Sequence, residues 1–285
     1  MHLLVLGANG MAGRTISTYM MEKGHRVTGF DRGPVTHCTR GVAGDACNQD
    51  ELAALVRAED YDAVINCIGL LNQFAEENHV LAVYLNSYLP HFLAEITKDS
   101  RTRVLHMSTD CVFSGKRGGY TEADLRDGST FYDRSKALGE LEDGKNLTLR
   151  GSIVGPDVNP RGIGLLNWFM QQQGPVKGYT RAMWTGQTTL QLAKTMEAAL
   201  EKGAAGLVNT VPDHAISKYD MLRLFNRYLR HDEVEIIPFD GFVADKSLQR
   251  TNFTFDYVIP DYETMIVEMA AWMQMHKHLY PHYRL

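Results

Sequence analysis

Continuous apolar runs and amphipathic segments alternate along the first 155 residues. "HLLVL" (2–6) is entirely apolar apart from its histidine, whereas "NQDELAALVRAED" (48–60) repeats its apolar residues at helical spacing behind Asn48, the expected N-cap. Short continuous apolar runs are typical of strands buried on both faces of a parallel sheet. The predicted strands are 2–6, 25–31, 61–69, 102–110 and 146–155, and the predicted helices are 14–24, 48–60, 79–99 and 129–143. This alternation predicts an α/β fold with a doubly wound parallel sheet of the Rossmann type.

The alternation becomes looser after about residue 155. Residues 157–174 are predicted to form a loop and then a helix, and 178–189 another loop. Further helices are predicted at 188–203, 217–229 and 261–276, and strands at 204–211 and 234–239. We therefore expect a Rossmann domain at 1–155 and a smaller α/β substrate-binding part at 156–285. The segment of about 188–212 is expected to belong to the first sheet again.

Composition excludes several classes of protein. A formal charge of −5 argues against a nucleic-acid surface, and no segment has the roughly 20 apolar residues of a membrane span. The N-terminus has no basic region of a signal peptide, and the four cysteines suit reduced thiols, so we expect a cytoplasmic protein. The His-rich stretch 276–282 is interpreted as a solvated tail, and no metal site is expected.

Three glycines follow the first predicted strand. Gly7, Gly10 and Gly13 enclose Asn9 and Met11 in a GxxGxxG turn that opens the first predicted helix. Glycine lets the chain turn tightly, lets a diphosphate approach the backbone, and lets the helix pack closely on the strand. A helix N-terminus also offers free N–H groups to an anion. The turn predicts dinucleotide binding, although a purely structural turn would use the same residues.

The second predicted strand ends at a carboxylate. Asp31 is placed to bind the adenosine ribose hydroxyls, which favours NAD(H), but Arg32 and Arg14 could instead clamp a 2′-phosphate. The choice stays open, with NADP(H) slightly favoured. Asp45, followed by Ala46, is placed to reach the adenine; the alternative is a plain helix-entry residue.

Tyr132 and Lys136 stand one helical turn apart in "STFYDRSKALGE". A phenol is a weak acid at neutral pH, and a nearby ammonium favours its phenolate, so the pair could deliver a proton to a carbonyl. Such a pair can also be an ordinary surface contact. Ser108 and Thr109, at the carboxyl end of a predicted strand, could supply the hydroxyl that holds the carbonyl.

The chain resembles the extended short-chain dehydrogenase/reductase superfamily and, within it, the dTDP-4-dehydrorhamnose reductase family. The resemblance covers about 150 residues and is carried by "GANGMAG", "DAVINCIG", "STDCVFSGKRGGYTE", "FYDRSKALGE" and "LRGSIVGP". It implies that Tyr132 donates the proton, that Lys136 binds the nicotinamide ribose and lowers the tyrosine pKa, and that Thr109 holds the substrate carbonyl. It further implies that Asn66, Cys67, Ile68 and Gly69 line the nicotinamide side, that Asn86 braces a helix or a water, and that Asp110 contacts the sugar or caps the strand end.

A nucleotide-sugar substrate would need cationic and aromatic groups in the C-terminal part. The cationic candidates are Arg150, Arg161 and Arg181, and the aromatic ones are Trp168 and Trp184. Cys111 departs from the family pattern, which commonly has an aromatic residue there, and this leaves the identity of the sugar open.

The sequence thus predicts an NAD(P)H-dependent reductase of a nucleotide-activated 4-keto-6-deoxy sugar. Two alternatives remain: a 4-epimerase or dehydratase with tightly bound NAD, and a non-catalytic regulatory subunit that keeps the cofactor fold. A homodimer is a further open expectation.

Overall fold

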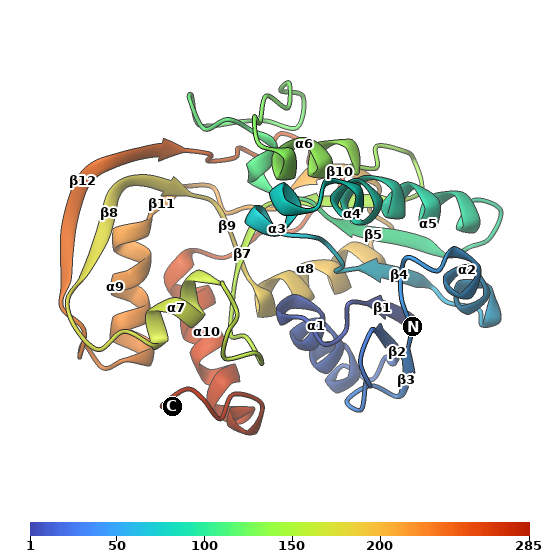
Figure 1. The fold of residues 1–285 in the computed structure, drawn as a ribbon, viewed down its shortest axis with the longest axis horizontal. Helices are drawn as coiled ribbons and strands as arrows, with labels where there is room; N and C mark the ends of the chain where they lie inside the picture. The colour runs from blue at the N-terminus through green and yellow to red at the C-terminus, as the bar shows by residue number, and fades with distance from the viewer.

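A seven-stranded parallel sheet forms the centre of the protein, whose computed structural model describes residues 1–285. The strands stand in the order β10-β6-β5-β4-β1-β2-β3 and all their pairings are parallel (Figure 1). Their bounds are β1 His2–Leu6, β2 Arg26–Asp31, β3 Arg40–Ala43, β4 Ala63–Asn66, β5 Arg103–Met107, β6 Leu147–Arg150 and β10 Gly206–Asn209. The predicted doubly wound parallel sheet is confirmed.

Helices cover both faces of this sheet because its strands bury side chains on both faces. Successive residues of β1 alternate: Leu3 packs in a cluster with α1 and α8, and Leu4 in one with α2 and α5. Asn48 caps α2 as predicted, since its side chain accepts the Glu51 N–H. The helices around the sheet are α1 Met11–Glu22, α2 Gln49–Ala58, α3 Asn72–Glu77, α4 His79–Ala82, α5 Leu89–Thr97, α6 Phe131–Leu138 and α8 Thr189–Glu201.

The remaining elements build a second core beside the sheet, on the left in Figure 1. A three-stranded sheet, β11-β8-β12, packs against α9. The predicted loop at 178–189 is wrong, because β8 occupies most of it and buries alternate residues such as Ala182 and Trp184. The bounds are β7 Ser152–Val154, α7 Leu165–Met170, β8 Val176–Trp184, β9 Gly186–Thr188, β11 Ile216–Ser217, α9 Lys218–Leu229, β12 Ile236–Asp245 and α10 Tyr262–Met275.

Two predicted elements around the site differ in detail. The helix expected at 79–99 is divided into α4 and α5 by a π-helical turn at Val83–Tyr88. The strand expected at 146–155 is interrupted at Gly151, so that β6 stays in the main sheet while β7 pairs with β9.

The stretch 276–282 is packed, which corrects the prediction of a solvated tail. Tyr280 is 1% exposed within the C-terminal core, and His276 stacks on Trp272 and lies 2.7 Å from the Glu22 carboxylate. The aromatic residues of the stretch anchor it, because each buries a large apolar surface. None of the helices combines the length and the apolar character needed to cross a bilayer.

Candidate active site at the carboxyl ends of the strands

The predicted cofactor and catalytic residues follow neighbouring parallel strands. The glycine turn follows β1, residues 67–69 follow β4, and residues 108–110 follow β5. Because these strands are parallel neighbours, their carboxyl ends meet at one edge of the sheet, where α/β folds bind ligands. The structure therefore brings together residues that lie more than 100 positions apart in the sequence.

The glycine turn is packed too closely for larger residues. Gly7 has φ +78°, and a Cβ on Gly13 would lie 2.1 Å from the Gly7 carbonyl oxygen. Gly10 is the N-cap of α1 without any side-chain cap, and the first turn of the helix has no acidic residue. The helix N-terminus therefore keeps free N–H groups for an anion, as a cofactor diphosphate requires.

Asp31 is oriented at the end of β2 by two backbone donors. The Asn9 N–H donates to one carboxylate oxygen at 3.0 Å and the Arg32 N–H to the other at 2.8 Å. These bonds fix the carboxylate beside the glycine turn. The arrangement fits a dinucleotide whose adenosine ribose lies next to β2.

Arg14 and His37 form a second polar group close to this edge. The guanidinium lies 2.8 Å from His37 Nδ1, while Arg14 Nε and His37 Nε2 are buried without any partner. Burial, and then the charge of Arg14, lower the pKa of His37 to about 4. The imidazole is therefore neutral at physiological pH, and the guanidinium keeps its charge free of any carboxylate.

Asp45 accepts hydrogen bonds just before the start of α2. Its carboxylate accepts the Cys47 N–H at 2.9 Å, its carbonyl accepts the Asn48 N–H, and the following Ala46 is 5% exposed. These contacts match the alternative of a helix-entry residue, and the role of Asp45 toward adenine stays a prediction.

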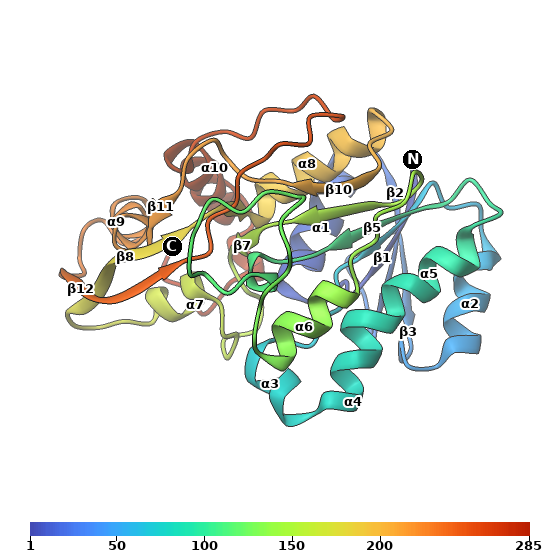
Figure 2. The ribbon, with the colours of Figure 1, turned by 90° about the horizontal axis from the view of Figure 1, so that it is seen from above.

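Tyr132 lies under the short helix α3. Ala75 of α3 and Ala82 of α4 form an apolar cluster with its ring, and the Glu76 carboxylate accepts the Tyr132 N–H at 3.0 Å. Figure 2 shows α3 and α4 beside α6, which carries the tyrosine. No motif in the sequence pointed to Glu76, since its contact depends on how these helices meet.

The three predicted catalytic side chains are all buried where α6 meets the turn after β5. Tyr132, Lys136 and Thr109 are 7%, 5% and 8% exposed. Burial raises the pKa of Tyr132, the Cys111 thiol raises it further, and the nearby Thr109 hydroxyl lowers it. Burial lowers the pKa of Lys136 to about 8. The proton-donor form of the phenol is thus favoured in the absence of ligands.

Lys136 points toward strand β5 behind the tyrosine. Its ammonium donates to the Met107 carbonyl at 2.7 Å and lies 3.4 Å from His106 Nε2. His106 is fully buried, and nothing in its apolar strand pattern marked it as a partner of the lysine.

Asn86 sits in the π-helical turn and ties three segments together. Its amide accepts the Leu70 N–H at 2.8 Å, donates to the Leu70 carbonyl at 2.9 Å, and donates to Ser135 Oγ at 3.0 Å. The end of α6 approaches this turn so closely that a Cβ on Gly139 would lie 1.9 Å from the Asn86 carbonyl oxygen. Local π-turns of this kind often occur at functional sites.

Asp110 is buried beside Thr109. It accepts hydrogen bonds from the Thr109 hydroxyl at 3.1 Å and from Ser152 Oγ at 2.5 Å. Burial raises the pKa of Asp110, and it also raises the pKa values of Cys67 and Cys111, to about 12 and about 11. Both cysteines are therefore protonated thiols at neutral pH, as expected of small apolar fillers.

Two of the substrate-side candidates are buried in other contacts. Arg150 is excluded as a ligand for a diphosphate, because it is fully buried in an ion pair with Glu140. Trp184 is 8% exposed and packs against Tyr262 in the C-terminal core, with ring centroids 5.8 Å apart. The remaining candidates, Arg161, Arg181 and Trp168, are exposed.

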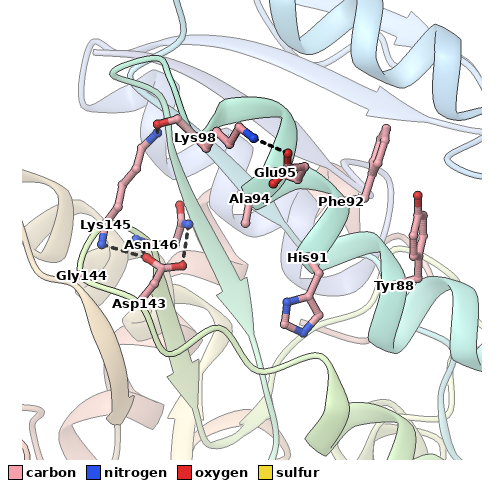
Figure 3. Close-up of a pocket in the computed structure, with 10 residues that line it drawn as sticks. All are labelled: Tyr88, His91, Phe92, Ala94, Glu95, Lys98, Asp143, Gly144, Lys145 and Asn146. Carbon is pink, nitrogen blue, oxygen red and sulfur yellow. Dashed lines mark hydrogen bonds and ion pairs between the residues drawn. The ribbon is translucent and has the colours of Figure 1, made fainter.

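A hollow on the surface lies beside helix α5, away from the glycine turn. It runs between α5 and the loop before β6, and Figure 3 shows Lys98, Glu95 and His91 on one side of it and Asp143–Asn146 on the other. Its residues lie along α5 and in the loop before β6, and none of the predicted cofactor or catalytic residues lines it. The structure contains no group of three or more His, Cys, Asp or Glu side chains that could hold a metal ion.

The family model described as the RmlD substrate binding domain matches residues 1–148 of this chain. The probable low-salt glycan biosynthesis reductase Agl14 of Haloferax volcanii is 29% identical over 238 residues, which are 77% of each chain. The dTDP-4-keto-6-deoxy-D-glucose reductase of Streptomyces niveus is 25% identical over 82% of this chain and 81% of its own length. The dTDP-4-dehydrorhamnose reductase of Aggregatibacter actinomycetemcomitans is 29% identical over a shorter stretch, 48% of this chain and 45% of its own.

Solved structures share the fold over nearly the whole chain. The dTDP-4-dehydrorhamnose reductase of Bacillus anthracis, in complex with NADP, superposes with a TM-score of 0.80 over 95% of this chain and 99% of its own, at 18% identity. A UDP-glucose 4-epimerase from Thermotoga maritima superposes with a TM-score of 0.79 over 97% and 100%, at 15% identity. Reductases and epimerases thus share this fold, and the fold alone does not separate them.

Proposed function

This chain belongs to the RmlD substrate binding domain family, and from that membership and its strand-edge site we propose that it is an NAD(P)H-dependent reductase of a nucleotide-activated 4-keto-6-deoxy sugar. The observation that carries the proposal is the packing of α6 on the turn after β5, which buries Tyr132, Lys136 and Thr109 there. The names of the relatives support the substrate class, because they describe reductases of dTDP-4-keto sugars.

The bound cofactor would supply hydride to the sugar carbonyl, and the protein would supply orientation and a proton. Thr109 would hold the carbonyl oxygen through its hydroxyl, and Tyr132 would protonate that oxygen as negative charge develops. Burial keeps the phenol protonated until then. The ammonium of Lys136 would favour the phenolate that remains, so that proton transfer is easier.

The residues near the end of β2 support a preference for NADP(H) over NAD(H). Arg14 carries an uncompensated charge next to the neutral His37, and its Nε has no partner within the protein. A 2′-phosphate would satisfy such a guanidinium. Asp31 opposes this preference by repulsion, so we propose that NADPH is preferred and NADH is still used.

The remaining parts of the proposal concern the substrate and its setting. We propose that residues 156–285 bind the nucleotide sugar, with 188–212 belonging to the Rossmann sheet, and that the exposed Arg161, Arg181 and Trp168 are the first positions to test for contact with it. The cytoplasmic location and the homodimer stay predictions.

A panel assay tests the proposed function. The purified protein is mixed with NADPH or NADH and each of several 4-keto nucleotide sugars, and the loss of reduced-nicotinamide absorbance is recorded. We expect turnover with at least one dTDP-linked substrate and a loss of about 100-fold or more in kcat for Tyr132→Phe, with cofactor binding retained. Cofactor that co-purifies at one per chain, with epimerisation instead of net oxidation, would point to the epimerase alternative.

A further inference from the structure

A buried polar chain connects the end of β4 to Lys136. Asn66 Nδ2 lies 3.2 Å from His106 Nδ1, and His106 Nε2 lies 3.4 Å from the lysine nitrogen. Asn66 and His106 are 1% and 0% exposed, so water does not compete for these contacts. Neighbouring strands hold the two side chains in register, since Asn66 of β4 pairs with His106 of β5.

The orientation of the Asn66 amide determines which imidazole nitrogen carries the proton. Its oxygen accepts the Ile68 N–H at 3.1 Å, which leaves the NH₂ group facing His106. An NH₂ group can only donate, so His106 Nδ1 must be the acceptor. In the neutral imidazole the proton is then on Nε2, the nitrogen that faces Lys136.

An Nε2–H group facing Lys136 suits an amine better than an ammonium. The neutral amine can accept from Nε2–H and still donate to the Met107 carbonyl at 2.7 Å, whereas an ammonium has no lone pair to accept that proton. A doubly protonated His106 would place a second buried cation beside the lysine, and burial together with Lys136 holds the pKa of His106 well below its usual range.

We propose that His106, held by Asn66 in the Nε2–H tautomer, is a positioning residue that favours the neutral amine of Lys136 until a ligand offers hydroxyl acceptors to it. The proposal deepens the proposed function, because ribose hydroxyls are the acceptors that would stabilise the ammonium. Ligand binding would then raise the fraction of Lys136 that is protonated, and the ammonium that aids Tyr132 would be most stable in the loaded site.

The other ionisable groups near the chain are few. Glu140, two residues past the end of α6, raises the pKa of the lysine but is already paired with Arg150. His91 on α5 further lowers the pKa of His106. Neither group contacts the lysine nitrogen directly. The tautomer of His106, which does contact that nitrogen, therefore decides whether the nitrogen can donate or accept a hydrogen bond there.

The first test observes the tautomer itself in the cofactor-free protein. Long-range ¹H–¹⁵N correlation spectra of the ¹⁵N-histidine-labelled protein distinguish the two neutral tautomers and the imidazolium, and His106→Gln assigns the signal. We expect the Nε2–H tautomer at pH 7. The Nδ1–H tautomer or an imidazolium in the wild-type protein would overturn the proposal, and His106→Gln serves only to assign the signal.

The second test reverses the tautomer. In Asn66→Asp a carboxylate replaces the NH₂ group and accepts from Nδ1–H, which turns Nε2 into an acceptor for the lysine ammonium. We expect the protonation equilibrium of Lys136, followed by its ¹³Cε shift against pH, to move at least tenfold toward the ammonium. The new carboxylate also attracts the ammonium directly, so the same substitution is made in a His106→Leu background.

A smaller shift in the His106→Leu background than in the wild-type background supports the proposal. Equal shifts in both backgrounds would mean that the carboxylate acts on Lys136 without the imidazole, and would overturn it. All of these measurements use the cofactor-free protein, so a failure to reduce any sugar in the panel assay leaves their outcome intact and the two proposals fail separately.

Discussion

Arg150 donates two hydrogen bonds to Glu140, from Nε to Oε1 at 2.7 Å and from Nη2 to Oε2 at 2.6 Å, and both side chains are buried from solvent. Glu140 also accepts from Ser108 Oγ at 2.6 Å, directly before Thr109. Burial would raise the pKa of Glu140, but the hydrogen bonds and charge of Arg150 outweigh it and lower the pKa. The ion pair therefore fixes the strand end that carries the proposed catalytic threonine.

Removing one partner of this pair should destabilise the protein strongly. We expect Glu140→Ala to lower the free energy of unfolding by about 3 to 5 kcal/mol, because it leaves the Arg150 guanidinium buried without compensation. Urea denaturation measures this change. The double variant Glu140→Leu with Arg150→Met should recover much of the loss, and a double variant as unstable as the single one would contradict the reason given.

A side chain at Gly13 should separate the first helix from its strand. We expect Gly13→Ala to cost about 1 to 3 kcal/mol in stability and to weaken cofactor binding at least tenfold, because its Cβ would meet the Gly7 carbonyl at 2.1 Å. Calorimetric titration with NADPH and urea denaturation measure the two effects. Gly144→Ala is the matched control, since a Cβ there meets no atom within 4 Å.

The buried Lys136 should make stability depend on pH in a defined window. Its pKa is lowered to about 8 in the folded protein and returns to about 10.4 on unfolding, so between these values the unfolded chain binds more protons and stability rises with pH. Below pH 8 the folded protein carries the full penalty of a buried ammonium.

Lys136→Met removes this penalty and should be inactive as a reductase. Relative to the wild type, the variant should be more stable at pH 7 than at pH 10 by about 2 to 3 kcal/mol. Urea denaturation of both proteins at the two pH values measures the difference, and other titrating groups cancel in the comparison. A difference that does not change with pH would mean that the pKa of Lys136 is not lowered by burial.

Two substitutions near the proposed adenosine site should change the preference between NADPH and NADH in opposite directions. Arg14→Leu should lower kcat/KM with NADPH about tenfold or more and leave NADH nearly unchanged, because only the 2′-phosphate needs the guanidinium. Asp31→Ser should lower kcat/KM with NADH more than with NADPH. Equal losses with both cofactors in Arg14→Leu would indicate a structural role, which its contact with His37 would explain.

The main sheet could be predicted because its strands are continuous apolar runs buried on both faces. The same reasoning missed β8, which was predicted to be a loop, because its pairing with β12 joins segments about 60 residues apart. It also missed the π-helical turn at 83–88, because the position of Asn86 in that turn is set by contacts with residues 70 and 135.

The same distinction between local motifs and long-range contacts decides which site residues could be predicted. Gly7 and Tyr132 stand in local motifs whose residue spacing is what the chemistry requires, so the sequence alone indicates them. Glu76 and His106 acquire their partners only when α3 meets α6 and when β5 passes behind α6. Arg150 was misjudged for a related reason: nothing local shows that Glu140 lies opposite it in the fold.

The strand β10 completes the main sheet from a late part of the chain, since residues 206–209 pair with β6, which ends nearly 60 residues earlier. During synthesis on the ribosome the chain emerges N-terminus first, at about 5 to 20 residues per second. The outer side of β6 therefore stays exposed for several seconds after the other six strands have emerged, and unpaired edges of this kind invite pairing with other chains. A nascent chain of this protein would rely most on chaperone protection during that interval, and ribosome stalling between residues 150 and 206 should be the point at which it aggregates most readily.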